Sequence, residues 1–208
     1  MPSLGLAASD GSSFPVDRAP AGFSRLVLYV YPRTGRPGAA PLTPDWDQIP
    51  GAPGCTAESC GFRDHAADLA QAGAAVAGVS TQDTAYQAEA VERLRLPFPL
   101  LSDADLRLAD ALRLPTFHAG GQVLLRRLTL AVRRGVIEEG LLPRVPARGS
   151  RRGSPPAAAR EESAPVIRFH RTMRQTAKLA LSTNCYFRAQ RPSHSRGIAT
   201  DPLWPAHT

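Results

Sequence analysis

The sequence has few cysteines and no long apolar run. Its 208 residues hold three cysteines, too few for the disulfide framework of a small secreted protein. No stretch approaches the roughly 18 consecutive apolar residues of a membrane-spanning helix. Residues 1–6 lack the basic and apolar regions of a signal peptide. We therefore expect a cytoplasmic protein that does not associate with membranes, in a compartment where thiols can do chemistry.

Lysine is almost absent, and the positive charge is confined to one end. Residues 1–137 hold 13 Arg, no Lys and 13 acidic residues, so their net charge is zero. Residues 138–208 hold 11 Arg and one Lys against five acids, which accounts for the whole formal charge of +7. The first part is thus neutral, and few aromatics are interleaved with the arginines of the second. We expect no specific nucleic-acid binding.

The pattern before residue 138 is that of an α/β domain. Short apolar runs alternate with amphipathic stretches, and a turn signal at Arg133-Arg134-Gly135 closes the series. This order predicts a sandwich with a mixed central sheet flanked by helices. The expected strands are 24–31, 74–80 and 98–102, the expected helices 56–72, 85–94 and 104–112, and the expected hairpin joins 123–132 to 136–137.

The pattern ends near residue 138. From there prolines recur up to Pro165, and Arg and polar residues dominate. Residues 168–181 could form an isolated helix, but it would have no clear partner. Such a composition favours disorder. We therefore divide the chain into a domain of residues 1–137 and a basic, Pro- and Arg-rich tail of residues 138–208. Cys185 lies in this tail and is interpreted as an incidental thiol.

Two cysteines share the segment Pro53-Gly54-Cys55-Thr56-Ala57-Glu58-Ser59-Cys60-Gly61-Phe62-Arg63-Asp64. A helix starting at Cys55 or Thr56 would give the first thiol unpaired N–H donors and a positive dipole end, both of which favour a thiolate. Five positions along a helix would separate the two Cα atoms by about 8–9 Å, beyond the ~7 Å limit for a disulfide. A Cys55–Cys60 bridge would therefore require the first turns to unwind.

The same segment, with 27–32 before it and 98–103 after it, resembles peroxiredoxins of the bacterioferritin-comigratory, or PrxQ, type. The resemblance implies a thioredoxin-like fold and a thiol-dependent peroxidase that acts on hydrogen peroxide or alkyl hydroperoxides. It implies that Cys55 is the peroxidatic thiol and Cys60 the resolving thiol. Thioredoxin or a similar dithiol would reduce the resulting disulfide.

The resemblance also points to Arg127 and, with departures, to Thr34. Arg127 stands in Arg-Leu-Thr-Leu, where the family has an Arg that stabilises the thiolate and the peroxide. The alternative is that Arg126 and Arg127 form a solvated hairpin edge. The family's peroxide-binding hydroxyl would fall on Ala52, but a loop of residues 35–51 interrupts the motif. Thr34 is therefore our candidate for that hydroxyl.

The resemblance also implies a further strand segment and then an amphipathic helix that covers the sheet. That helix is missing from the tail, so we interpret residues 138–208 as an aberrant, out-of-frame or misannotated translation. Two other functions stay open for the domain: a thiol–disulfide oxidoreductase, and an inactive thioredoxin-like domain that binds a partner. Cys55, Cys60 and His65 have no fourth ligand with zinc-finger spacing. No glycine-rich phosphate loop occurs. We expect neither a metal nor a cofactor.

Overall fold

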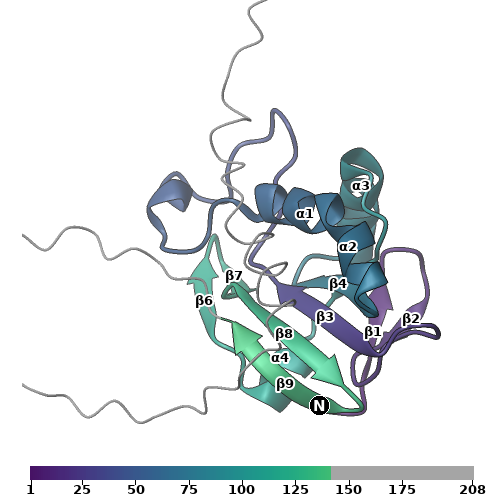
Figure 1. Cartoon of the computed structure of the whole chain (residues 1–208). Helices are drawn as coiled ribbons and strands as arrows, with labels where there is room; N and C mark the ends of the chain where they lie inside the picture. The colour runs from purple at the N-terminus through teal and green to yellow at the C-terminus, as the bar shows by residue number, and fades with distance from the viewer. Residues whose placement is uncertain (142–208) are drawn as a thin grey trace, which may run out of the picture.

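The computed structural model describes residues 1–141. These residues form a sandwich whose elements follow one another in the order shown in Figure 1. The elements are β1 (Gly5–Ala8), β2 (Ser13–Pro15), β3 (Arg25–Val30), a 3₁₀ turn η1 (Trp46–Gln48), α1 (Cys55–Asp64), α2 (Ala66–Gln71), β4 (Ala74–Ser80), α3 (Thr84–Leu94), β5 (Leu100–Ser102), α4 (Arg107–Leu112), β6 (Thr116–Ala119), β7 (Gln122–Leu125), β8 (Leu128–Arg133) and β9 (Val136–Leu141).

The central sheet is mixed, which confirms the predicted fold class. Its seven strands lie in the order β2-β1-β5-β4-β3-β8-β9. The pairs β3–β4 and β4–β5 are parallel, whereas β1–β5, β3–β8 and β8–β9 are antiparallel. The strands β6 and β7 form a separate antiparallel hairpin. Parallel neighbours are joined by helical crossovers, as right-handed β–α–β units require.

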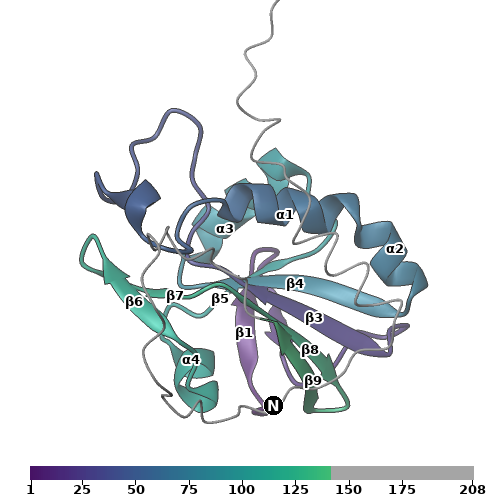
Figure 2. The same cartoon turned by 60° about the vertical axis from the view of Figure 1, so that its left-hand side comes forward.

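Side chains of β3 alternate between two apolar layers. Val27 and Tyr29 pack with Phe62 of α1 and with residues of α2 and α3. Leu28 faces the opposite side, where it belongs to the same cluster as Leu108 of α4. Figure 2 shows this division, with α1, α2 and α3 above the sheet and α4 on the other side. The period of two along a buried strand thus sets which helices cover which face.

Two predicted elements were wrong in extent. The helix expected over 56–72 is broken at His65, where φ of −106° and ψ of 7° leave the α-helical range and separate α1 from α2. The helix expected from Ala104 begins only at Arg107. Asp103 still caps it, because its carboxylate accepts the N–H groups of Leu108 and Ala109 at 2.9 Å each.

The strand expected over 123–132 was also wrong. The chain leaves the β6–β7 hairpin after Leu125 and enters the central sheet only at Leu128. The reversal between β6 and β7 uses Gly120 and Gly121, both at positive φ, which glycine adopts without strain. The β8–β9 hairpin, by contrast, turns at Arg134 and Gly135 as expected.

The tail lies largely outside the described residues. β9 continues through Leu141, past the boundary that the sequence suggested at residue 137. The predictions for Cys185 and for residues 142–208 fall outside the described part of the chain. Within residues 1–141, none of the helices has both the length and the apolar character needed to cross a membrane.

Candidate active site

Cys55 is the first residue of α1 and is almost completely buried, with 2% of its surface exposed. Gly54 precedes it with φ of 97°, a left-handed conformation that a side chain would strain. The Cys55 thiol donates a hydrogen bond to the carbonyl oxygen of Ala52 at 3.3 Å. The turn before the helix therefore holds the sulfur inward, beneath the end of the preceding loop.

Arg127 reaches this thiol from the segment between β7 and β8. Its Nη2 lies 3.1 Å from Cys55 Sγ and donates to the carbonyl oxygen of Pro53 at 2.9 Å. Only 15% of its side chain is exposed, so Arg127 does not belong to a solvated hairpin edge. Its neighbour Arg126 is exposed and lies over the ring of Phe117. The break that the sequence did not predict between β7 and β8 is what turns Arg127 towards Cys55.

Glu58 completes the site, although no sequence signal pointed to it. Oε2 of this buried carboxylate lies 3.1 Å from Arg127 Nε. The contact is an ion pair rather than an aligned hydrogen bond, because neither Glu58 oxygen accepts a hydrogen bond within residues 1–141. Burial raises the pKa of Glu58 to about 7, although the charge of Arg127 acts in the opposite direction. Arg127 is therefore shared between Glu58 and Cys55.

Burial is also the largest influence on the pKa of the Cys55 thiol. It raises the pKa of Cys55 to about 11, although Arg127 lowers it; the negative charge of Glu58 adds to the rise. A hydrogen bond from the backbone of Arg33 also lowers it. The expectation that the helix N-terminus favours a thiolate at Cys55 stays a prediction, because burial acts on the pKa of this thiol in the opposite direction. Without the charge on Glu58, the positive charge of Arg127 would act on Cys55 alone and would lower the pKa of this thiol.

We expect the wild-type protein to lose stability as the pH rises towards neutrality, and Glu58→Gln to lack this loss. The folded-state pKa of about 7 lies above the ordinary value of 4.5, so the folded state holds a proton that the unfolded state releases. Stability from this group is complete below about pH 4.5 and is lost as the pH rises through about 7, by about 3 kcal/mol at most. Urea unfolding of both proteins from about pH 5 to pH 8 measures it.

The wild-type free energy of unfolding should fall over this range relative to that of Glu58→Gln. Parallel curves would contradict the raised pKa. The same variant should lower the pKa of Cys55, because the charge of Glu58 raises it, and an ultraviolet titration of the thiolate measures that change.

Thr34 is buried near the site but is engaged elsewhere. Its backbone N–H and its hydroxyl both donate to Oε1 of Gln82, at 2.9 and 3.1 Å. Its carbonyl oxygen accepts from the hydroxyl of Tyr86 at 3.1 Å. A role for this hydroxyl in peroxide binding thus stays a prediction.

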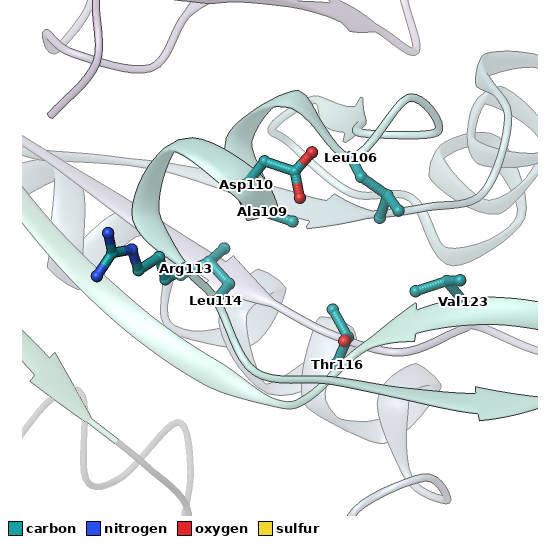
Figure 3. Close-up of a pocket in the computed structure, with 7 residues that line it drawn as sticks. All are labelled: Leu106, Ala109, Asp110, Arg113, Leu114, Thr116 and Val123. Carbon is teal, nitrogen blue, oxygen red and sulfur yellow. The ribbon is translucent and has the colours of Figure 1, made fainter.

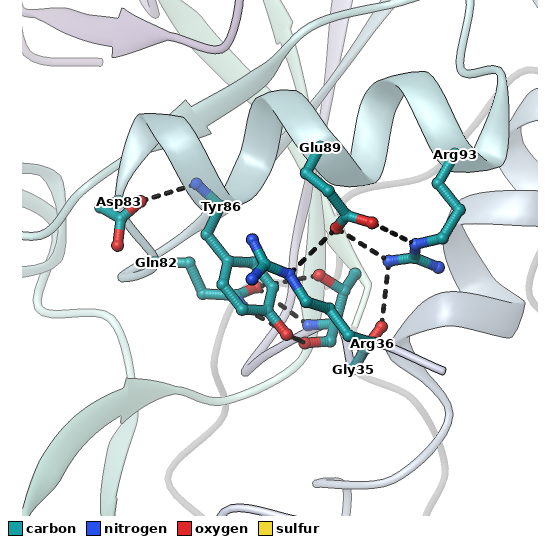
Figure 4. Close-up of polar contacts among 8 residues, drawn as sticks. Gly35, Arg36, Gln82, Asp83, Tyr86, Glu89 and Arg93 are labelled. Atoms are coloured by element: carbon teal, nitrogen blue, oxygen red, sulfur yellow. Dashed lines mark hydrogen bonds and ion pairs between the residues drawn. The ribbon is translucent and has the colours of Figure 1, made fainter. Parts of the chain in front are cut away.

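The segment after Thr34 is fixed on α3 by charged groups (Figure 4). Arg36 lies 4.3 Å above the ring of Tyr86 and pairs with Glu89. Arg93 also pairs with Glu89, and it donates to the carbonyl oxygen of Gly35 at 3.0 Å. These contacts hold the start of the long loop where the sequence motif departs from that of the family.

The end of the same loop rests on the β6–β7 hairpin. Ala52 is fully buried in a small cluster with Phe117 and Leu124, against which Trp46 and Ile49 of the loop pack. Ala52 therefore fills the position of the family's hydroxyl with an apolar contact, while its carbonyl oxygen accepts from Cys55. This cluster places the turn that carries Cys55.

Cys60 lies on α1 with Cys55, and the two are not joined by a disulfide. Both therefore lie on one continuous helix, as their spacing predicted. His65 pairs with Asp68 at 3.4 Å and does not join them. Within residues 1–141, no cluster of three or more His, Cys, Asp or Glu side chains could hold a metal ion.

A hollow of about 300 Å³ lies elsewhere, between α4 and the β6–β7 hairpin. Figure 3 shows its apolar walls, formed by residues such as Leu114 and Val123, with Asp110 and Arg113 also lining it. None of its lining residues belongs to the Cys55 site, so this hollow is not part of the candidate active site.

A cysteine at a helix N-terminus, beside an arginine on a thioredoxin-like sandwich, is the arrangement that the resemblance to peroxiredoxins implied. The comparisons agree: residues 49–139 match the model of the AhpC/TSA family. This matched region is similar to bacterioferritin-comigratory proteins and to peroxiredoxin Q. The resemblance identified in the sequence is thereby confirmed.

Two relatives illustrate the similarity. The chain is 36% identical over 107 residues to the putative peroxiredoxin Rv1608c of Mycobacterium tuberculosis, covering 51% of this chain and 59% of the relative. It is 35% identical over 81 residues to the putative peroxiredoxin bcp of Coxiella burnetii, covering 39% of this chain and 43% of the relative. The matched region thus spans about half the length of these curated relatives.

A solved structure supports the fold. The crystal structure of peroxidoxin BcpB from Mycobacterium tuberculosis superposes with a TM-score of 0.52 at 23% identity, covering 91% of this chain and 94% of that one. At this identity the match establishes the thioredoxin-like fold alone.

Proposed function

We propose that this chain is a thiol-dependent peroxidase that reduces hydrogen peroxide or alkyl hydroperoxides. The observation that carries the proposal is Arg127 Nη2 lying 3.1 Å from Cys55 Sγ at the start of α1. A guanidinium in this place stabilises a thiolate and can also hold a peroxide oxygen, because it has several donors and keeps its charge. The similarity of residues 49–139 to the AhpC/TSA family, and of the chain to a putative peroxiredoxin, supports the same reaction.

The reaction has two steps in this site. The Cys55 thiolate attacks one peroxide oxygen, the O–O bond breaks, and the other oxygen leaves as water or an alcohol after taking up the thiol proton. Cys55 is then a sulfenic acid. The Cys60 thiol attacks its sulfur, releasing water and forming the Cys55–Cys60 disulfide. A dithiol such as thioredoxin returns both cysteines to thiols.

The protonation of Cys55 shapes the first step. With a pKa of about 11, the buried thiol needs a proton acceptor when peroxide binds. Glu58 has a pKa of about 7, near neutrality. Because Arg127 contacts both Glu58 and Cys55, the charge on Glu58 controls how strongly the guanidinium interacts with the Cys55 sulfur. Protonation of Glu58 would release the charge of Arg127 to the thiolate.

The location of the cysteines weighs against an oxidoreductase of protein disulfides. Cys55 is 2% exposed, so a protein disulfide cannot reach its sulfur without unwinding of α1, whereas a small peroxide can do so with less rearrangement.

We further propose that residues 1–137 form the catalytic domain and that it works in the cytoplasm, where a dithiol reductant is available, with neither nucleic acid nor membrane as a partner.

We expect Cys60→Ser to react once with peroxide and stop. Without the second thiol, the sulfenic acid at Cys55 has no intramolecular partner, so it should accumulate in about one equivalent per chain. Dimedone labelling mapped by peptide mass spectrometry measures it. The matched control is Cys185→Ser, which should turn over normally with thioredoxin. A Cys60→Ser protein that keeps normal turnover with thioredoxin would contradict the role of Cys60.

A further inference from the structure

A chain of two buried hydroxyl groups connects β3 to the first turn of α1. The hydroxyl of Tyr29 donates to Oγ of Ser59 at 3.2 Å. Ser59 Oγ in turn donates to the backbone carbonyl oxygen of Cys55 at 3.1 Å. Tyr29 and Ser59 have no exposed surface, and Cys55 has 2%. The proposed peroxidase reaction as described above uses neither hydroxyl.

The second bond spans the part of the helix that must open. Ser59 directly precedes Cys60, so its contact with the Cys55 carbonyl crosses the turn between the two cysteines. An intact helix holds their Cα atoms about 8–9 Å apart, beyond the ~7 Å limit for a disulfide. A Cys55–Cys60 bond therefore requires this turn to unwind, which breaks the contact of Ser59.

Tyr29 is held so that it cannot follow Ser59. Its ring stacks on Phe62 with centroids 4.5 Å apart and on Tyr31 at 5.5 Å. The ring also occupies the space above Gly78, where a Cβ atom would lie 2.6 Å from it. Burial raises the pKa of Tyr29 well above its ordinary value, so the hydroxyl stays a donor. Unwinding would leave this donor buried without its acceptor.

We propose that Tyr29 and Ser59 form a latch that holds the first turn of α1 closed and opposes formation of the Cys55–Cys60 disulfide. They are positioning residues, because they act on the helix rather than on substrate. The latch sets the thiol–disulfide equilibrium of the pair. If the proposed peroxidase function holds, it also sets how long the sulfenic acid at Cys55 survives before Cys60 captures it.

The test is an equilibrium with glutathione, which requires no peroxide. In this reaction Cys55 and Cys60 lose two electrons and two protons, and one glutathione disulfide becomes two glutathione thiols. Full-length Cys185→Ser protein is the background, so that only the pair responds. In this background Ser59→Ala and Tyr29→Phe should each shift the equilibrium constant towards the disulfide by about three- to tenfold, because each removes a hydrogen bond of the closed state.

The direction in which Ser59→Ala shifts the thiol–disulfide equilibrium distinguishes loss of the latch from a change in helix propensity. Alanine favours helix more than serine does, so an effect of propensity alone would shift Ser59→Ala towards the dithiol. Ser24→Ala is the matched control, because it also removes a hydroxyl-to-carbonyl hydrogen bond, to Gly73, but immediately before β3 and away from α1. It should leave the equilibrium unchanged. The double variant Tyr29→Phe/Ser59→Ala should shift it less than the product of the two single effects, because the two hydroxyls form one chain.

An unchanged constant in both single variants, or a shift of Ser59→Ala towards the dithiol, would overturn the latch. So would a background protein that forms no Cys55–Cys60 disulfide in any glutathione buffer. The proposed function fails in a different way. A protein that shows the expected shifts but consumes no peroxide would refute the peroxidase and leave the latch intact.

Discussion

Cys55→Ser removes all peroxide consumption. A serine hydroxyl is a far weaker nucleophile than a thiolate and cannot form a sulfenic acid. The thioredoxin-coupled rate should therefore fall to that of protein-free buffer. The substitution changes one buried atom at the start of α1, where the serine hydroxyl can still donate to the carbonyl oxygen of Ala52. We expect the fold to persist, and circular dichroism with thermal unfolding checks it.

Cys185→Ser is the matched control for this variant. It makes the same substitution at the third cysteine of the chain and should leave the peroxidase rate unchanged. Residual turnover in Cys55→Ser above the buffer rate would remove Cys55 from the role proposed for it. Loss of activity in Cys185→Ser would contradict the assignment of that cysteine as incidental.

Arg127→Met lowers the rate of peroxide reduction by about 100- to 1000-fold, the range seen when a preorganised donor to developing charge is removed. The loss has two parts. The Cys55 pKa rises further, because Arg127 is the charge that lowers it, and the peroxide oxygens lose their cationic donor. Second-order rate constants measured across pH separate these parts, because a higher pH restores only the thiolate.

The variant also leaves Glu58 buried without its ion pair, which destabilises the fold on its own. The double variant Arg127→Met/Glu58→Gln removes that charge and should regain stability. It should not regain activity. If it did recover the wild-type rate, the effect of Arg127 would be structural, and its proposed role towards thiolate and peroxide would be wrong. Arg127→Lys should also lose most activity, because one ammonium cannot match the donors that reach Cys55, Pro53 and Glu58.

The central strands and the start of α1 could be predicted because their signals are local. Residues 74–80 are a continuous apolar run between breaks, and the strand has these bounds in the structure. β1 and β2 were missed because they are short and their apolar residues show no period. The position of β1 depends on pairing with β5, a contact with residues far along the chain, and β2 in turn pairs with β1.

The site was predicted in part for the same reason. The motif around Cys55 identified the thiol and, through the resemblance, Arg127. Glu58 was missed because an acid in the first turn of a helix is what the dipole alone would favour on a solvent-facing surface. Its burial results from α1 packing against the segment that carries Arg127, which no local pattern encodes. The buried thiol's raised pKa has the same origin.

The most direct measurement is peptide mass spectrometry of the wild-type protein after one equivalent of hydrogen peroxide. Our account predicts that the peptides holding Cys55 and Cys60 lose the mass of two hydrogen atoms through a disulfide between these residues, while Cys185 stays a thiol. Dithiol treatment should restore the original mass. Two unmodified thiols with the peroxide still present, or a disulfide that leaves Cys55 out, would contradict the account.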